Sequence, residues 1–338
     1  MKLKTIFLTS VIAILTFTSC HDTEEFDNNT RGNFEALWTI IDQHYCFFKE
    51  KGIDWDDVHR RYSERVSERM TSSELFALMS EMLGELKDGH TNLSSVYGTS
   101  YYRRWWSDYP QNYSARLIEE SYFNFNYQQA GGLMFGILPS NIGYIRYASF
   151  SIAPGEGNLN YIFDCLAECD GLIIDVRDNG GGELTNVEKL GRRFITQRTL
   201  AGYIYHKSGP GHNDFSDPYA YYYEPAEKGH TIWGKPVAVL TNRSTFSAAN
   251  NFVAFMKNLP QAVIVGATTG GGSAMPFNSE LPNGWNIRFS ASPVLDAEGK
   301  HTEFGIEPTE GCAVDMDSQA ALDGHDTILD FAIERLLK

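Results

Sequence analysis

One turn of the chain holds a serine in a position suited to nucleophilic catalysis. Ser247 follows a predicted strand at residues 237–240 and precedes an apolar helical run at residues 252–256. Near the start of a helix, unpaired amides and the helix dipole favour a developing negative charge. A nucleophile with an oxyanion hole would be useful there. The alternative is structural, with Ser244 or Thr245 as the helix N-cap and Ser247 as a small packing residue.

A second segment ends a predicted buried strand in three glycines. It spans residues 175–182, with the sequence DVRDNGGG. Glycine lets the backbone approach a ligand closely, and successive exposed amides form an anion-binding concavity. The segment lacks the lysine and the glycine spacing of nucleotide-binding loops, so a phosphate site is not indicated. An anion-binding loop and a plain tight turn both stay open at this point.

Two further segments carry a histidine and a glutamate. His90 lies between a glycine and a threonine in residues 86–91 (LKDGHT), on a turn from which an imidazole can reach out of the fold. It is one of nine histidines, and a lone histidine is more often structural than catalytic. Glu303 lies in residues 303–308 (EFGIEP), a turn near the end of the predicted core.

The second half of the chain predicts an α/β fold that places two of these segments together. After Gly143, short apolar runs alternate with helical segments, as in parallel sheets. The predicted strands are residues 144–150, 172–176, 237–240 and 263–265. The last three end in turns rich in Gly, Asn or Ser, so their carboxyl ends should share one edge of the sheet. Open α/β sheets place their sites at that edge.

The first part of the chain predicts a helical subdomain. Apolar residues recur at helical spacing over residues 34–48 and 55–66. Thr71 and Glu74 form a capping box ahead of a third apolar run at residues 75–86. Residues 97–127 then contain 11 aromatic side chains in 31 positions without a clear period. Such density is equally consistent with a binding cleft and with a packed, twisted sheet.

Composition excludes several classes of protein. The chain has 338 residues, of which 42% are hydrophobic and 21% charged, so it is neither disordered nor a multi-span membrane protein. A formal charge of −15 argues against nucleic acid as a partner, because phosphate neutralisation needs clustered cations. Five cysteines are too few for a disulfide scaffold, and no zinc-binding spacing occurs. We therefore expect no metal, no cofactor and no nucleic-acid partner, and four ordinary buried thiols besides Cys20.

The N-terminus predicts export and lipidation. Lys2 and Lys4 precede an apolar run at residues 6–17, which is too short to span a bilayer and is typical of a signal peptide, here residues 1–19. Residues 17–20 (FTSC) resemble the bacterial lipobox, in which Cys20 would be acylated. The acidic segment 20–33 is predicted to be a tether. We expect a membrane-anchored lipoprotein, in the outer membrane and facing the periplasm or the cell surface.

Taken in order, these motifs resemble the tail-specific, or C-terminal processing, serine peptidases. The matching segments are LKDGHT, IDVRDNGGG, TNRSTFSAA, VGATTGG and FGIEP. Residues 34–55 also resemble the helical entry of the branch that contains the tricorn core protease and interphotoreceptor retinoid-binding protein. The resemblance implies a crotonase/ClpP-like β/α spiral core at residues 96–338, with an N-terminal helical subdomain at residues 34–95. Only 51 residues separate Thr91 from Gly143, too few for the PDZ domain of the processing branch.

The resemblance also implies roles for individual residues. The processing branch uses a lysine base, but Gly271 stands at the matching position, so a Ser/Lys dyad is disfavoured. The tricorn branch implies Ser247 as nucleophile and His90 as general base. The amides of Gly181 and Ala248 match the oxyanion donors.

The acidic partner of the base stays open. Glu303 matches the acidic orienter of the tricorn branch, but its spacing to the next glycine is one residue shorter than usual, so Glu307 and Glu280 are alternatives. The serine that assists the base in that branch is absent, because Gly89 occupies its place.

The implied activity is hydrolysis of peptide bonds in peptides or unfolded proteins. The aromatic segment at residues 97–127 is the candidate for substrate contact. The competing hypothesis is a binding module of the same fold, with a weak or inactive site, that holds an apolar, peptide or carbohydrate ligand.

Overall fold

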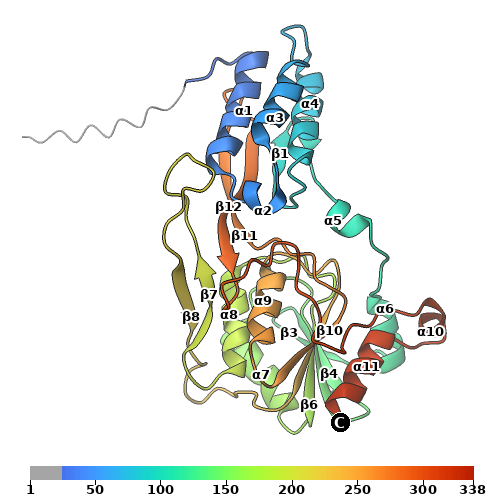
Figure 1. The fold of residues 1–338 in the computed structure, drawn as a ribbon. Coiled ribbons are helices and arrows are strands. Elements are labelled where there is room, and N and C mark those ends of the chain that lie inside the picture. Colours follow the sequence, from blue (N-terminus) through green and yellow to red (C-terminus); the bar gives the residue numbers. More distant parts are fainter. Residues whose placement is uncertain (1–24) are drawn as a thin grey trace, which may run out of the picture.

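The computed structural model describes residues 25–338 as two lobes joined by a long antiparallel hairpin (Figure 1). The predicted signal peptide and Cys20 lie outside the described residues. The first helix, α1 (Thr30–His44), has Asn29 as its N-cap, whose side chain accepts a hydrogen bond from Gly32 N at 2.7 Å. Residues 30–33 of the predicted tether are therefore helical, because this cap starts the helix earlier than the apolar pattern indicates.

The upper lobe is a layer of helices on a small sheet. The predicted capping box is confirmed, since Thr71 Oγ1 accepts a bond from Glu74 N and the Glu74 carboxylate accepts one from Thr71 N. Apolar side chains of the helices and the strands form one core. The elements of this lobe are α1, α2 (Phe48–Lys51), α3 (Trp55–Ser63), α4 (Ser72–Gly84), β1 (Asn92–Ser95), β2 (Gly98–Thr99), β11 (Ala274–Glu280) and β12 (Asn286–Leu295).

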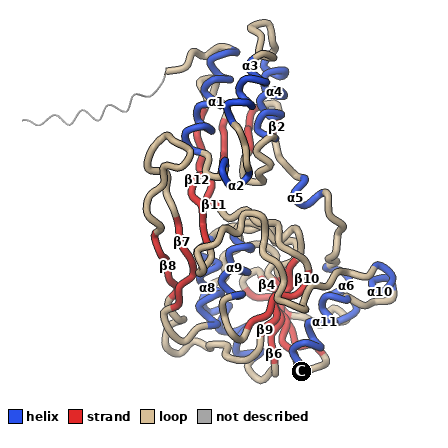
Figure 2. The backbone as a smooth tube through the Cα atoms, in the orientation of Figure 1, coloured by secondary structure: helices blue, strands red, loops and turns tan. Residues whose placement is uncertain are grey.

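The β11–β12 hairpin ties the two lobes together. The start of β12 pairs with β1 in the upper lobe, and its end pairs with β7 (Thr199–Ile204), which continues to β8 (Tyr219–Tyr223). Figure 2 shows these strands running down one side of the molecule. Ile287 and Phe289 are fully buried in the core of the helical lobe. The helical subdomain is thus completed by residues 274–295, far beyond residue 95 in the sequence.

The lower lobe contains the predicted α/β sheet, with the strand order β10-β9-β6-β5-β4-β3. Strands β5, β6, β9 and β10 are parallel, as the sequence predicts, although β5 begins two residues and ends four residues earlier than the predicted strand at residues 144–150. Every residue of β5, β6 and β9 is buried, which explains their nearly continuous apolar sequence. The strands are β3 (Gln128–Ala130), β4 (Leu133–Leu138), β5 (Ile142–Arg146), β6 (Gly171–Asp175), β9 (Val237–Thr241) and β10 (Ala262–Gly266).

Helices cover both faces of this sheet. Helices α7 (Glu156–Leu166), α8 (Leu184–Gly191) and α9 (Ala248–Lys257) pack on one face, with Ile174 and Val239 of the strands. Helix α11 (Thr327–Leu336) packs on the other face against Ile173 and Ala238, because successive strand residues point to opposite sides. The remaining short elements are α5 (Arg104–Ser107), α6 (Ala115–Leu117), η1 (Ile118–Tyr122), η2 (Arg192–Phe194) and α10 (Ser318–Leu322).

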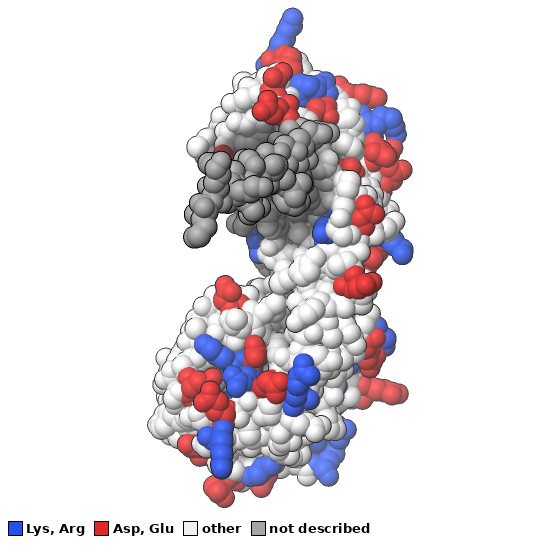
Figure 3. Space-filling model, turned by 90° about the vertical axis from the view of Figure 1, so that its left-hand side faces the viewer, with Lys and Arg blue, Asp and Glu red and all other residues white. Residues whose placement is uncertain are grey.

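Between the lobes the molecule narrows, and one face is hollowed there (Figure 3). Within residues 25–338, no helix has the length and apolar character needed to cross a membrane. The same part of the chain contains no cluster of three or more His, Cys, Asp or Glu side chains that could bind a metal. The four thiols of this part are free, but Cys165 is exposed rather than buried as expected, because it lies on the solvent face of α7.

Candidate active site

The turns after β6 and β9 meet at the carboxyl edge of the sheet, as the sequence predicts. Phe246 N donates a hydrogen bond to Asn179 O at 3.0 Å, which joins the serine turn to the glycine turn. The fully buried Arg177 anchors the glycine turn by ion pairs to Asp175 at 2.6 Å and to Asp326 at 2.8 Å. Both turns are therefore held rigidly against the sheet.

Ser247 lies on a sharp turn directly before α9. Its backbone has φ 58° and ψ −123°, a conformation that disfavours a residue with a side chain and costs about 1–3 kcal/mol. Ser247 N donates to Gly271 O at 2.8 Å, which holds the turn in place. His90 Nε2 lies 2.9 Å from Ser247 Oγ, although 157 positions separate the two residues. The structure thus brings the predicted nucleophile and the predicted base into hydrogen-bonding contact.

The imidazole of His90 is held in its neutral form. The residue is only 3% exposed, and burial lowers its pKa to about 4, against the effect of Asp88 and with the help of Arg288 and Lys51. A neutral imidazole can accept the serine proton at neutral pH. Its Nδ1 atom is buried and has no hydrogen-bond partner within residues 25–338. The second ring nitrogen therefore lacks the acidic partner that the resemblance implies.

Asp88 holds the backbone of His90 rather than its ring. Asp88 Oδ1 accepts a hydrogen bond from His90 N at 2.7 Å, and Oδ2 accepts one from Tyr45 Oη at 2.9 Å. Burial acts against the charge of Asp88, yet Lys51 and the hydrogen bonds from His90 N and Tyr45 Oη keep its pKa below the usual value. The sequence motifs assign no role to Asp88. An aspartate two positions before a turn residue often bonds that residue's amide, and this local pattern is the signal that could have found it.

Glu303 lies near the site but does not contact the imidazole. Its Oε1 pairs with Lys51 Nζ at 2.9 Å, and its Oε2 accepts a hydrogen bond from Ser273 N at 2.9 Å. Both oxygens are thus committed elsewhere, so the expected contact with the base is not formed. Burial and the neighbouring Asp88 raise the pKa of Glu303 to about 7, although Lys51 opposes this. The alternatives Glu307 and Glu280 are both exposed.

One of the two expected oxyanion donors is available and the other is occupied. Ala248 N, at the first residue of α9, donates to no acceptor within the described residues. Gly181 N donates to Asn179 Oδ1 at 2.9 Å, and the Asn179 amide donates in turn to Tyr147 O at 2.7 Å. An oxyanion at Ser247 would therefore meet the Ala248 amide directly and would have to share the Gly181 amide with Asn179.

Position 271 has no room for a side chain. Gly271 has φ 81°, and a Cβ atom there would lie 1.8 Å from Glu303 O. The lysine base of the processing branch therefore cannot stand at this position in this chain. Lys257, at the far end of α9, is exposed and donates to Glu307 O at 2.7 Å.

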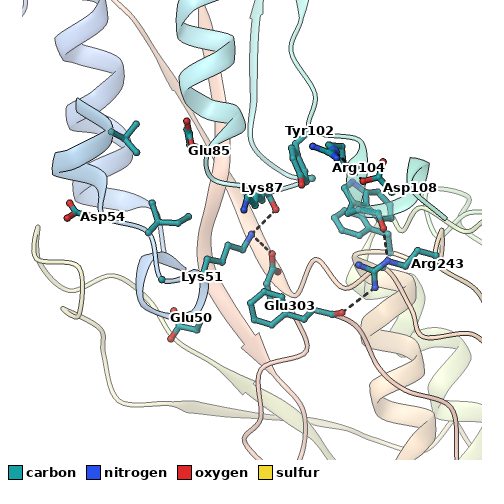
Figure 4. Close-up of a pocket in the computed structure, with 18 of the residues that line it drawn as sticks. Glu50, Lys51, Asp54, Glu85, Lys87, Tyr102, Arg104, Asp108, Arg243 and Glu303 are labelled. Carbon is teal, nitrogen blue, oxygen red and sulfur yellow. Dashed lines mark hydrogen bonds and ion pairs between the residues drawn. The ribbon is translucent and has the colours of Figure 1, made fainter. Parts of the chain in front are cut away.

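Two cavities lie beside the turns that carry the site, next to Trp105 and Arg243. The cavities have volumes of about 620 and 420 Å³, and both residues line both of them. The Trp105 ring stacks on Phe246 with centroids 4.1 Å apart, and Arg243 Nε donates to Trp105 O at 2.6 Å. Figure 4 shows Arg243 and Glu303 at the larger cavity. The aromatic segment at residues 97–127 is mostly loop and short helix, so the hypothesis of a packed sheet is wrong.

Comparison with known proteins assigns a family. Residues 141–311 match peptidase family S41, and residues 26–84 match the tricorn protease C1 domain. The first match covers half of the chain, and the chain belongs to peptidase family S41. The carboxy-terminal processing protease CtpB of Bacillus subtilis is 28% identical over 174 residues, which are 50% of this chain and 33% of that protein. CtpA of the same organism is 27% identical over 172 residues, with shares of 50% and 34%. The chain thus spans about a third of the length of these curated relatives.

Solved structures confirm the predicted fold class. A structure from Parabacteroides merdae, described as that of a candidate peptidase, is 48% identical with a TM-score of 0.87. The match covers 92% of this chain and 98% of that chain. Mature CPAF shares the fold with a TM-score of 0.67 at 12% identity, over 91% of this chain and 96% of that chain. An α/β peptidase core with an N-terminal helical subdomain is therefore the architecture of this chain.

The tight packing around Gly181 predicts that a methyl group added at this position, as in Gly181→Ala, disturbs the site at Ser247. A Cβ atom at Gly181 would lie 2.7 Å from Ser247 Cβ and 2.9 Å from Ala248 N, and its φ of 99° is unfavourable for alanine. We expect Gly181→Ala to reduce covalent labelling of Ser247 by an alkyl fluorophosphonate at least about 100-fold, the scale of misplaced reacting groups. The matched control is Gly180→Ala, where a Cβ meets no atom within 4 Å. Equal labelling of the two variants would contradict the geometry.

The burial of His90 predicts an unusual pH dependence. A base with a pKa of about 4 stays unprotonated until the pH falls well below 6.5, the value of a solvated histidine. We expect the labelling rate of Ser247 to be lost only as the pH approaches about 4. The measurement is repeated in Glu303→Gln, which removes the group with a pKa of about 7. An inflection that persists near pH 6.5 in this variant would show that the imidazole is not desolvated.

Proposed function

We propose that this chain is a serine peptidase that hydrolyses peptide bonds through an acyl-enzyme at Ser247. The observation that carries the proposal is the 2.9 Å contact between His90 Nε2 and Ser247 Oγ at the amino end of α9. A neutral imidazole in contact with a serine hydroxyl is the arrangement that activates a nucleophile. Membership of peptidase family S41 supports the same reaction.

The chemistry follows from the positions of these groups. His90 Nε2 accepts the proton of Ser247 Oγ as the oxygen attacks the carbonyl carbon of the substrate. The resulting oxyanion is stabilised by the Ala248 amide and by the shared Gly181 amide, and the loss of one such donor costs about 3 kcal/mol elsewhere. The imidazolium then protonates the leaving amine. Water, activated by the same imidazole, releases the acid product and restores Ser247.

The substrate class we propose is a peptide or an unfolded protein. The B. subtilis relatives are named carboxy-terminal processing proteases, which supports action on polypeptides. Four side chains of the aromatic segment line the two cavities near the His90–Ser247 pair, namely Tyr102, Trp105, Trp106 and Tyr109. These side chains can supply apolar contacts to an extended chain.

We also propose that the protein is a lipoprotein anchored through Cys20, in the outer membrane and facing the periplasm or the cell surface. The support is the sequence alone, namely the apolar run and the FTSC segment. Acyl chains contribute about 0.8 kcal/mol of membrane affinity per buried methylene. The acidic residues that follow Cys20 would keep the peptidase away from the membrane surface.

The proposed function is tested by active-site labelling. We expect an alkyl fluorophosphonate to label the parent protein once, with no labelling of Ser247→Ala and at least about 1,000-fold slower labelling of His90→Ala, as for loss of a general base. Lys257→Ala is the matched control and should react like the parent, because Lys257 lies at the opposite end of α9. A folded parent that is not labelled at neutral pH would favour the binding-module hypothesis. Loss of labelling in Lys257→Ala would restore a lysine-based mechanism.

A further inference from the structure

Lys51, whose side chain is largely buried, lies at the wall of the larger cavity, near the His90–Ser247 pair. Lys51 is the last residue of α2, and its side chain is 7% exposed. Its Nζ atom lies 2.9 Å from Glu303 Oε1 and 3.4 Å from Asp88 Oδ2, and it donates to Lys87 O at 3.3 Å. Figure 4 shows Lys51 extending from α2 toward Glu303. One ammonium group thus joins the helical lobe, the histidine turn and a loop of the peptidase core.

Through Asp88, the ammonium group of Lys51 is connected to the turn that carries His90. Asp88 Oδ2 forms the ion pair with Lys51 Nζ, and Oδ1 of the same carboxylate accepts the hydrogen bond from His90 N. The carboxylate therefore couples the position of the ammonium group to the turn that carries the imidazole.

Through Glu303, the same ammonium group is connected to the loop that holds the backbone of Ser247. Glu303 is held by Lys51 through Oε1, and its Oε2 accepts a bond from Ser273 N. The Glu303 carbonyl also accepts a bond from Gly272 N at 3.2 Å, and the preceding carbonyl, of Gly271, accepts one from Ser247 N at 2.8 Å. The loop that contacts Glu303 is thus the loop that holds the backbone of the serine.

The charges make Lys51 necessary for this arrangement. Asp88 and Glu303 are 1% and 7% exposed, and burial together with the nearby Asp88 raises the pKa of Glu303. Within residues 25–338, no other lysine or arginine forms an ion pair with either carboxylate. Two buried carboxylates without a cation cannot both stay ionised, and the one that takes a proton loses its charge-assisted bonds.

We propose that Lys51 is a positioning residue, whose ammonium group holds Asp88 and Glu303 and through them the two turns that carry His90 and Ser247. It forms no contact with either reacting atom. The inference rests on the proposed peptidase function, because it concerns the same pair of reacting groups.

Other charged or titratable groups also face this cluster. They are His90 from the turn, Arg288 from β12, and Tyr45, Cys46 and Glu50 from the helical lobe. Burial dominates the lowered pKa of His90, and the cations Lys51 and Arg288 lower it further, whereas Asp88 raises it. Removal of the Lys51 charge leaves Asp88 less compensated, so the pKa of His90 should rise. The acidic limb of the labelling rate should therefore move to higher pH.

The test compares Lys51→Met with Lys51→Arg and with Lys49→Met, an exposed lysine two positions earlier on the same helix. The second-order rate constant for labelling of Ser247 by a fluorophosphonate is measured from pH 4 to 9, together with thermal unfolding. We expect Lys51→Met to react about 10- to 100-fold more slowly at neutral pH, with its acidic limb shifted upward. Lys51→Arg should recover most of the rate and the parent pH profile, and Lys49→Met should behave like the parent.

The outcomes separate the two hypotheses. A parent that is not labelled contradicts the proposed function and this inference with it. A labelled parent, with a rate and pH profile in Lys51→Met equal to those of Lys49→Met, contradicts only the role of Lys51. If Lys51→Met does not fold, the double variant Lys51→Met/Glu303→Gln removes one cation and one anion together. This double variant should also react slowly with an upward shift of the acidic limb, and the parent rate and profile would overturn the inference.

Discussion

The ammonium group of Lys51 between two buried carboxylates is the interaction on which the geometry of the site depends. Asp88 accepts a hydrogen bond from the amide of His90. Glu303 O accepts one from Gly272 N, and the neighbouring carbonyl of Gly271 accepts one from Ser247 N. A buried ion cluster of this kind contributes little net stability, because desolvation offsets the attraction. The ion cluster instead determines the positions of the turns that carry His90 and Ser247. The ammonium group of Lys51 contacts both carboxylates, and these contacts bring three distant chain segments together.

That placement links the two lobes. His90 lies where the helical lobe meets the core, Ser247 belongs to the core, and Lys51 comes from α2 of the helical lobe. The β11–β12 hairpin runs through both lobes, and Arg288 of β12 lies 3.4 Å from the carbonyl of His90. A peptidase site assembled in this way is sensitive to the docking of the lobes. Gly89 and Phe246, the chain neighbours of His90 and Ser247, line the larger of the two cavities beside Trp105.

Local sequence patterns predicted the helices, the parallel strands and the serine turn, because these features depend on residues that are close together in the sequence. Apolar spacing located the helices and the parallel strands, and a serine at a strand-to-helix turn could be recognised without its partner. The contact between Glu303 and His90 could not be assessed in this way, because it depends on Lys51 and Ser273, which are distant in the sequence. Lys51 itself has no local signal, since it follows two charged residues on a four-residue helix. The occupied amide of Gly181 likewise depends on the rotamer of Asn179, which only packing decides.

In the proposed mechanism, Ser247 attacks a carbonyl group whose oxygen becomes an oxyanion directed at the amino end of α9. A crystal structure of the fluorophosphonate adduct tests it most directly. We expect phosphorus bound to Ser247 Oγ, a phosphoryl oxygen about 2.7–3.1 Å from the Ala248 amide, and Lys51 still between Asp88 and Glu303. An adduct on another residue would contradict the account, as would a phosphoryl oxygen that points away from Ala248.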